Sequence, residues 1–185
     1  MKKSKFFLGF AAGAALLMMG CGAYNTVSFT QADGVNFHAF HTYQWLPDQS
    51  DTINTAYNNE IIRSKIRTAI SHELNTRHLQ PAIDDASADL ALQLVIQTHD
   101  RSRDATRFTP GFYYGPFGGS YSNSRSYYEH QRWTLNLYER KTNHLVWTCT
   151  AEGDLNRAKD LEKNIQPAVE RIMKKYPVQP AGHSA

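Results

Sequence analysis

Two histidines and two aspartates in the middle of the chain are residue types that bind metal ions or transfer protons. His99, Asp100 and Asp104 stand directly after an alternating apolar segment, and His130 stands directly before another. If these segments are neighbouring strands, the four side chains gather where the strands end. His99, Asp100 and His130 are then a candidate metal-binding or small-ligand site with acid–base capacity. The alternative is that they are solvated, as histidines at strand ends usually are.

No familiar catalytic motif accompanies this group. The chain has no HExxH, GxSxG or CxxC pattern and no phosphate-binding glycine loop. His38 and His41 are three apart on an expected strand, so they point to opposite faces. Asp84, Asp85 and Asp89 precede a strand in an expected loop, where solvated acids are the default. We therefore expect no enzyme activity, no catalytic residues, no bound metal and no cofactor.

The first 20 residues have the pattern of a secretory signal peptide. Three lysines precede an apolar stretch over residues 6–19, and small residues follow it. The stretch is shorter than the ~20 residues that span a bilayer.

Cys21 refines this interpretation, because residues 18–21 (Met-Met-Gly-Cys) resemble the bacterial lipobox. The resemblance implies cleavage before Cys21 and acylation of that residue, with chains such as palmitate. Gly22 is not the aspartate that retains such lipoproteins at the inner membrane, which implies the periplasmic face of a Gram-negative outer membrane. The alternative is an ordinary secretory signal with Cys21 bridged to Cys149. An unpaired Cys149 is interpreted as a small buried residue of a strand.

The net charge argues against some partners. The formal charge is +3, but residues 1–20 hold three of the 20 basic side chains and no acidic one, which leaves 17 of each sign. A nucleic-acid-binding protein needs a surplus of basic side chains, so we expect no nucleic-acid partner. The same neutrality argues against a polybasic lipid-binding role.

Hydrophobic periodicity predicts the elements. They are a strand over 36–45, a helix over about 56–77, strands over 88–100, 131–140 and 144–155, and a closing helix that ends before Pro177. We expect that helix to begin near Gln166, with Pro167 in its first turn and residues 160–165 as a looser turn. The alternative is an earlier helix that kinks at Pro167. Asn143 is expected in a left-handed conformation in a hairpin between the last two strands.

These elements predict an α+β fold. The expected architecture is a two-layer sandwich, in chain order β-α-β-β-β-α, with two helices on one face of a sheet. The sheet is expected to be mainly antiparallel and to have about four strands, the first of which can lie parallel to a neighbour. The predicted organisation is a signal peptide at 1–20, Cys21 with a tether to 34, one domain over 35–177 and a flexible tail at 178–185.

Residues 107–130 interrupt the alternation with aromatic residues among glycines, serines and prolines. So many backbone breakers predict a long loop. One interpretation is a low-complexity insertion, and the other is a recognition loop rich in tyrosine. The candidate contacts are Phe112, Tyr113, Tyr114, Phe117, Tyr121, Tyr127 and Tyr128.

Four blocks in order resemble a family of bacterial lipoproteins grouped as domain of unknown function (DUF) 4136. They are FHTYQW (40–45), ADLALQL (88–94), WTLNLYERKTNHLVW (133–147) and ERIMKKYP (170–177). The resemblance covers residues 27–177 and implies an envelope location and this fold class, but no catalytic residue.

The combined expectation is a non-enzymatic binding or scaffold module of the cell envelope. Its partners are then the membrane, through the lipid anchor, and an envelope protein or peptidoglycan. The oligomeric state is left open.

Overall fold

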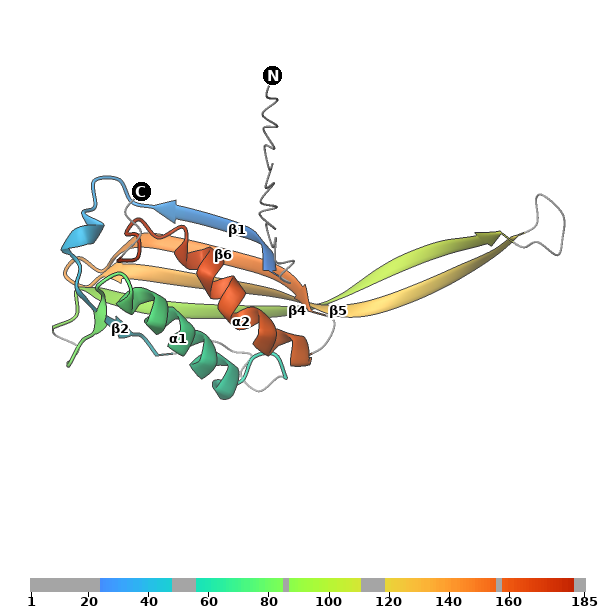
Figure 1. The fold of residues 1–185 in the computed structure, drawn as a ribbon, viewed down its shortest axis with the longest axis horizontal. Coiled ribbons are helices and arrows are strands. Elements are labelled where there is room, and N and C mark those ends of the chain that lie inside the picture. The colour runs from blue at the N-terminus through green and yellow to red at the C-terminus, as the bar shows by residue number, and fades with distance from the viewer. Residues whose placement is uncertain (1–23, 48–55, 85–86, 111–118, 156–157, 182–185) are drawn as a thin grey trace, which may run out of the picture.

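The computed structural model describes residues 24–47, 56–84, 87–110, 119–155 and 158–181. Within these ranges six strands form one mixed sheet in the order β1-β6-β5-β4-β2-β3, and two α-helices lie against one face of it (Figure 1). The elements are β1 Tyr24–Gln31, η1 Phe37–Ala39, β2 Thr42–Trp45, α1 Glu60–Asn75, β3 Gln80–Pro81, β4 Leu90–Pro110, β5 Gly119–Glu139, β6 His144–Leu155 and α2 Ala158–Met173. The predicted α+β class is confirmed, but the prediction of about four strands is wrong.

The first expected strand is shorter than predicted. Residues 37–39 form the 3₁₀ helix η1, and the Asn36 side chain accepts a hydrogen bond from the His38 amide at its start. Only Thr42–Trp45 is extended, and this β2 strand pairs parallel to β4. The pairs β4–β5, β5–β6 and β1–β6 are antiparallel. The sheet is thus mainly antiparallel, with a parallel edge.

The structure corrects the predicted tether at 21–34. Residues Tyr24–Gln31 form an edge strand that pairs along β6. Tyr24 is 1% exposed, its hydroxyl donates to Gln131 Oε1 at 2.6 Å, and its ring lies 4.3 Å from that of Trp133. The folded body therefore begins three residues after Cys21, and not near residue 35. The polar, turn-like composition of this segment hid the strand.

Helix α1 follows from capping and periodicity. The Asn59 side chain accepts a hydrogen bond from the Ile62 amide at 3.0 Å, which satisfies one of the free donors of the first turn. The buried residues Ile62, Ile66, Ile70 and Leu74 recur every fourth position, so one stripe faces the sheet.

Helix α2 begins earlier than predicted. It starts at Ala158, so Pro167 lies inside it and not in its first turn. A proline inside a helix removes one backbone hydrogen bond and costs about 3 kcal/mol. The apolar residues on both sides of Pro167, including Ile165 and Val169, are buried against the core and offset that cost. Neither helix in the described part of the chain is long and apolar enough to cross a membrane.

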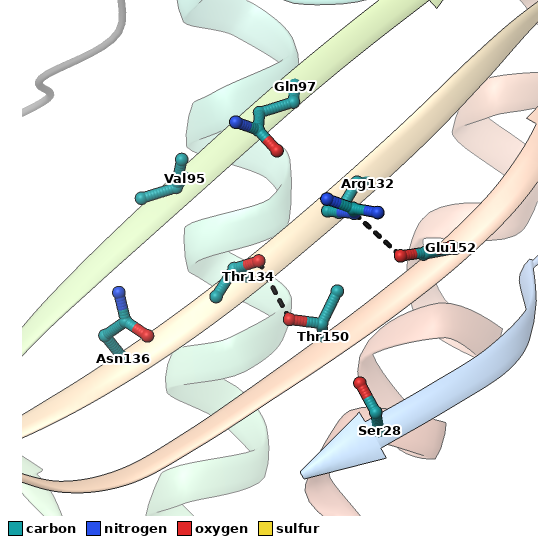
Figure 2. Close-up of a pocket in the computed structure, with 8 residues that line it drawn as sticks. All are labelled: Ser28, Val95, Gln97, Arg132, Thr134, Asn136, Thr150 and Glu152. Atoms are coloured by element: carbon teal, nitrogen blue, oxygen red, sulfur yellow. Dashed lines mark hydrogen bonds and ion pairs between the residues drawn. The ribbon is translucent and has the colours of Figure 1, made fainter. Parts of the chain in front are cut away.

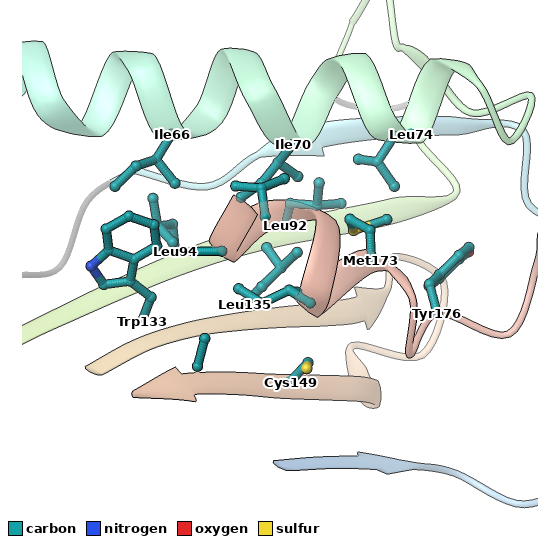
Figure 3. Packing of buried hydrophobic residues seen from close by; sticks show 14 of the residues in the cluster. Ile66, Ile70, Leu74, Leu92, Leu94, Trp133, Leu135, Cys149, Met173 and Tyr176 are labelled. Carbon is teal, nitrogen blue, oxygen red and sulfur yellow. The ribbon is translucent and has the colours of Figure 1, made fainter. Parts of the chain in front are cut away.

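The core lies between the sheet and the two helices (Figure 3). Alternate residues of the central strands point into it, as predicted: Leu90, Leu92, Leu94 and Ile96 from β4, and Trp133, Leu135 and Leu137 from β5. Cys149 of β6 is a free thiol in the same core, and burial raises its pKa to about 12. It is a packing residue, as the sequence indicated.

A bulge modifies the predicted hairpin between β5 and β6. Asn143 has φ 55°, which confirms the expected left-handed turn residue. Leu137 pairs with Trp147 and Tyr138 pairs with Leu145, so Val146 is an extra residue in β6. Val146 is buried and Leu145 is 44% exposed. Simple alternation would place Leu145 on the buried face with Trp147, but the bulge inverts its direction.

Candidate functional site

The most distinctive surface is a two-stranded arm made by the outer halves of β4 and β5. The two strands pair without interruption from Leu90–Glu139 to Pro110–Gly119. The β6 ladder on β5 ends at the Glu129–Leu155 pair. Beyond that pair, residues 101–110 and 119–128 project from the body as a twisted ribbon (Figure 1). We call these residues the arm.

The arm corrects the prediction of a long loop over 107–130. Serine, asparagine and arginine make up six of the ten residues 119–128, and cross-strand hydrogen bonds hold the ribbon despite this weak strand propensity. For example, Thr106 Oγ1 donates to Asn123 Oδ1 at 3.0 Å. The predicted contacts Phe112, Tyr113, Tyr114 and Phe117 lie outside the described residues.

One face of the arm is aromatic and electrically balanced. Because side chains alternate along a strand, this face continues the core side of β4 and β5. The rings of Phe108 and Tyr121 are 4.9 Å apart, and Tyr121 and Tyr127 are 75% and 73% exposed. Arg125 Nε donates to Asp104 Oδ1 at 2.7 Å, and this bond raises the pKa of Arg125. Of the predicted contact residues, Tyr121 and Tyr127 are therefore exposed on this face.

The opposite face of the arm is basic. Arg101, Arg103 and Arg107 project from β4 on this side and are exposed. The guanidinium of Arg103 lies 5.4 Å from the centre of the Tyr128 ring, so Tyr128 belongs to this face and not with the other predicted tyrosines. The spacings of two and four residues between these arginines would have indicated one strand face. The interpretation of the segment as a loop concealed it.

The predicted group of His99, Asp100, Asp104 and His130 is not brought together. His99 is directly opposite His130, whereas Asp100 is opposite Glu129 on the other face of the ribbon. His130 Nδ1 lies 2.8 Å from Asp154 Oδ1, and Asp104 is paired with Arg125. Within the described residues no three His, Cys, Asp or Glu side chains are placed to hold a metal ion. The proposed His99–Asp100–His130 site is therefore wrong in its geometry.

Asp100 and Glu129 mark the root of the arm, where the body ends. Partial burial, a hydrogen bond with Asp100 and the charge of Asp100 together raise the pKa of Glu129 to about 7. Burial raises the pKa of Tyr57, and the negative charges of Glu129, Asp100 and Asp160 raise it further. The root therefore places two acidic side chains between the body, which has an apolar core, and the arm, which has one basic face.

Asp89 has a structural role and is not a solvated loop acid as predicted. Its Oδ2 accepts hydrogen bonds from the amides of His41 and Thr42 at 2.9 and 3.0 Å and from Thr42 Oγ1 at 3.0 Å. Partial burial opposes ionisation, but these bonds outweigh it, so the pKa of Asp89 is lowered. Asp89 thereby ties the start of β2 to the start of β4.

The face of the sheet opposite the helices has a shallow depression of about 440 Å³. Its strongest polar groups satisfy one another: Arg132 Nε donates to Glu152 Oε1 at 2.7 Å, and the hydroxyls of Thr134 and Thr150 are 2.9 Å apart (Figure 2). The lining residues are Ser28, Val95, Gln97, Arg132, Thr134, Asn136, Thr150 and Glu152. This surface is a polar sheet face with an internal hydrogen-bond network.

The family model described as "Domain of unknown function (DUF4136)" matches residues 27–178. The chain belongs to the DUF4136 family. The resemblance seen in the sequence is thereby confirmed. No protein of curated function matches the chain.

Solved structures resemble the chain in fold. A DUF4136 family protein from Bacteroides thetaiotaomicron is 18% identical, with a TM-score of 0.52 over 84% of this chain and 96% of that one. A PDZ domain protein from Parabacteroides distasonis is 17% identical, with a TM-score of 0.56 over 84% of this chain, which spans only 36% of that protein. The PelC dodecamer from Paraburkholderia phytofirmans is 11% identical, with a TM-score of 0.46 over 80% of this chain and 94% of that one.

Proposed function

We propose that this DUF4136 chain is a non-enzymatic binding module, held by acyl chains on Cys21 at the periplasmic face of the outer membrane. In this proposal the aromatic face of the arm binds a protein partner in the cell envelope. The observation that carries the proposal is the arm itself, which adds nothing to the core and exposes aromatic rings to solvent.

The arm has the features of a binding element. A two-stranded ribbon is only marginally stable in water. A ribbon that projects from the body therefore does not serve stability, and we infer that it serves binding. Tyrosine offers a large amphipathic contact surface at low entropic cost. Within the described residues neither arm strand pairs with a third strand, which leaves backbone donors and acceptors for a partner's strand. This last feature favours a protein over peptidoglycan.

Two features support the anchor. The lysines, the apolar stretch and residues 18–21 follow the lipoprotein pattern. Because β1 begins at Tyr24, a fully extended chain allows only about 10 Å between Cys21 and the body. An acylated Cys21 would therefore hold the body against the membrane surface instead of on a long tether.

Site-specific photocrosslinking tests the arm. A photoreactive residue at Tyr121 or Tyr127 should capture one protein from intact envelopes. The matched control is Ile61, which is 68% exposed on the body and should capture nothing specific. Equal yields at all three positions would exclude the arm as the binding surface. Capture of glycan strands without protein would favour peptidoglycan.

Labelling with a radioactive or clickable palmitate tests the anchor separately. The wild-type chain should be labelled and sediment with outer membranes, whereas Cys21→Ser should be unlabelled. An unmodified thiol at position 21 in the processed wild-type chain would contradict the proposed anchor.

A further inference from the structure

The charges of the arm are segregated between its two faces. On the basic face, residues 101–109 of β4 and 120–128 of β5 contribute three arginines and no carboxylate. On the aromatic face, the one arginine, Arg125, is paired with Asp104. Overall neutrality argued against a polybasic role, but it conceals this local separation.

The three arginines form a linear array. Two residues along a strand advance by about 7 Å, so Arg101, Arg103 and Arg107 extend over about 20 Å. Arg103 has one long ion pair, 3.9 Å to Asp154 Oδ2. Ser122, Ser124 and Ser126, on the same face of the neighbouring strand, donate their hydroxyls to carbonyls across the ribbon. The guanidinium groups are thus the charged donors of this face, and they suit phosphate oxygens.

The first described residue after the proposed point of attachment lies at the root of the arm. Tyr24, the first residue of β1, donates to Gln131, which is two residues from Glu129 at the root. Figure 1 shows the start of β1 beside the point where the arm leaves the body. A membrane that holds Cys21 is therefore within reach of the basic face.

We propose that the arginine face of the arm binds the headgroups of anionic phospholipids in the membrane that carries the anchor. This inference rests on the proposed function, because the anchor places the lipid surface beside the arm. With its arginine face on the membrane, the arm presents Tyr121 and Tyr127 away from the lipid, toward a partner.

Vesicle binding tests the inference without the acyl chains. The chain from Gly22 to Ala185 contains every residue of the core cluster, so it keeps the folded body. It should bind vesicles in which about a third of the phosphatidylcholine is replaced by phosphatidylglycerol, and not vesicles of phosphatidylcholine alone. Each arginine near an anionic surface contributes about fivefold, so R101S/R103S/R107S should bind on the order of 100-fold more weakly. The binding should also weaken as salt is raised.

Arg125→Gln is the matched control, because it removes one arginine from the opposite face of the same ribbon. It should leave vesicle binding within about twofold of the wild type, below the loss for any single arginine of the basic face. Circular dichroism should show the same fold for all variants. The inference is overturned if the triple variant binds like the wild type, if R125Q loses as much as R101S, or if soluble dextran sulfate binds as tightly as the vesicles. Palmitate labelling of the wild-type chain tests the anchor independently. A failure of headgroup binding by the arm can therefore be distinguished from a failure of the proposed anchor.

Discussion

The inner and outer halves of β4 and β5 obey the same pairing rule but have opposite roles. In the body, the Leu92–Leu137 pair is fully buried under the helices. Sixteen residues further along β4, the Phe108–Tyr121 pair has the same cross-strand geometry but remains exposed. The difference lies only in what covers the strand, since β2, β6 and the helices flank the body half.

The comparison separates the sources of stability in the two regions. Burial of apolar area stabilises the body half, at about 1.5–3 kcal/mol for each large side chain. The arm has pairing hydrogen bonds and exposed ion pairs, which contribute little net free energy in water. The arm should therefore be held in place by the strands that continue into the body, and should contribute little to the stability of the body.

The largest contrast is expected from aromatic truncation. Trp133→Ala should lower the free energy of unfolding by about 3–5 kcal/mol, because it leaves a cavity under Tyr24 and removes a donor to Gln131. Tyr121→Ala should change it by less than about 0.5 kcal/mol, because that side chain is mostly exposed. Urea unfolding curves measure both. A comparable loss in the two variants would show that the arm is part of the core.

A second contrast uses asparagine in both regions. Asn58 is fully buried, and its Oδ1 accepts from Arg63 Nε at 2.9 Å. Asn58→Ala should cost about 1–3 kcal/mol, because the buried guanidinium loses an acceptor. Asn123→Ala removes only an exposed contact with Thr106 and should cost less than about 0.5 kcal/mol. The shift in the midpoint of thermal unfolding reports each cost, and equal shifts would contradict the proposed division.

Periodicity was sufficient to predict the central strands and helix α1 of the body. Apolar residues at every second position identified β4 and β5, and apolar residues at every fourth position identified α1, because both patterns arise from a one-sided core. The misplaced start of α2 has a physical cause: packing around Leu161 and Ile165 outweighed the local effect of Pro167.

The same method failed where no core imposes a pattern. The edge strand β1 has few apolar residues, and both faces of the arm carry polar residues, so binary patterning carries little signal there. The strands are defined instead by pairing with a partner that already has structure, at residues such as Val27 opposite Ala151 and Arg103 opposite Ser126. The basic face of the arm was missed for the same reason, because its arginines share one face only when the segment is an extended strand.

The smallest effect is expected at the boundary between the two regions. Glu129 has a pKa of about 7 in the folded chain, above its ordinary value of 4.5. The folded state therefore binds more protons than the unfolded state between these values. The associated stabilisation is fully present below about pH 4.5 and is lost as the pH rises through 7. Because Glu129 is only partly buried, solvent screening should keep the effect below about 1 kcal/mol.

Glu129→Gln should remove this pH dependence by replacing the titrating carboxyl with a neutral hydrogen-bonding group. Urea midpoints at about pH 5 and pH 8 should differ more for the wild type than for the variant. The control is Asp104→Asn, an exposed acid further out on the same face, which should leave the wild-type difference in place. Carbon-13 NMR of the Glu129 carboxyl should show its titration directly. Titration near 4.5 would mean that the acidic root is fully solvated, so that the body ends before Glu129 and the arm is longer than the strand pairing indicates.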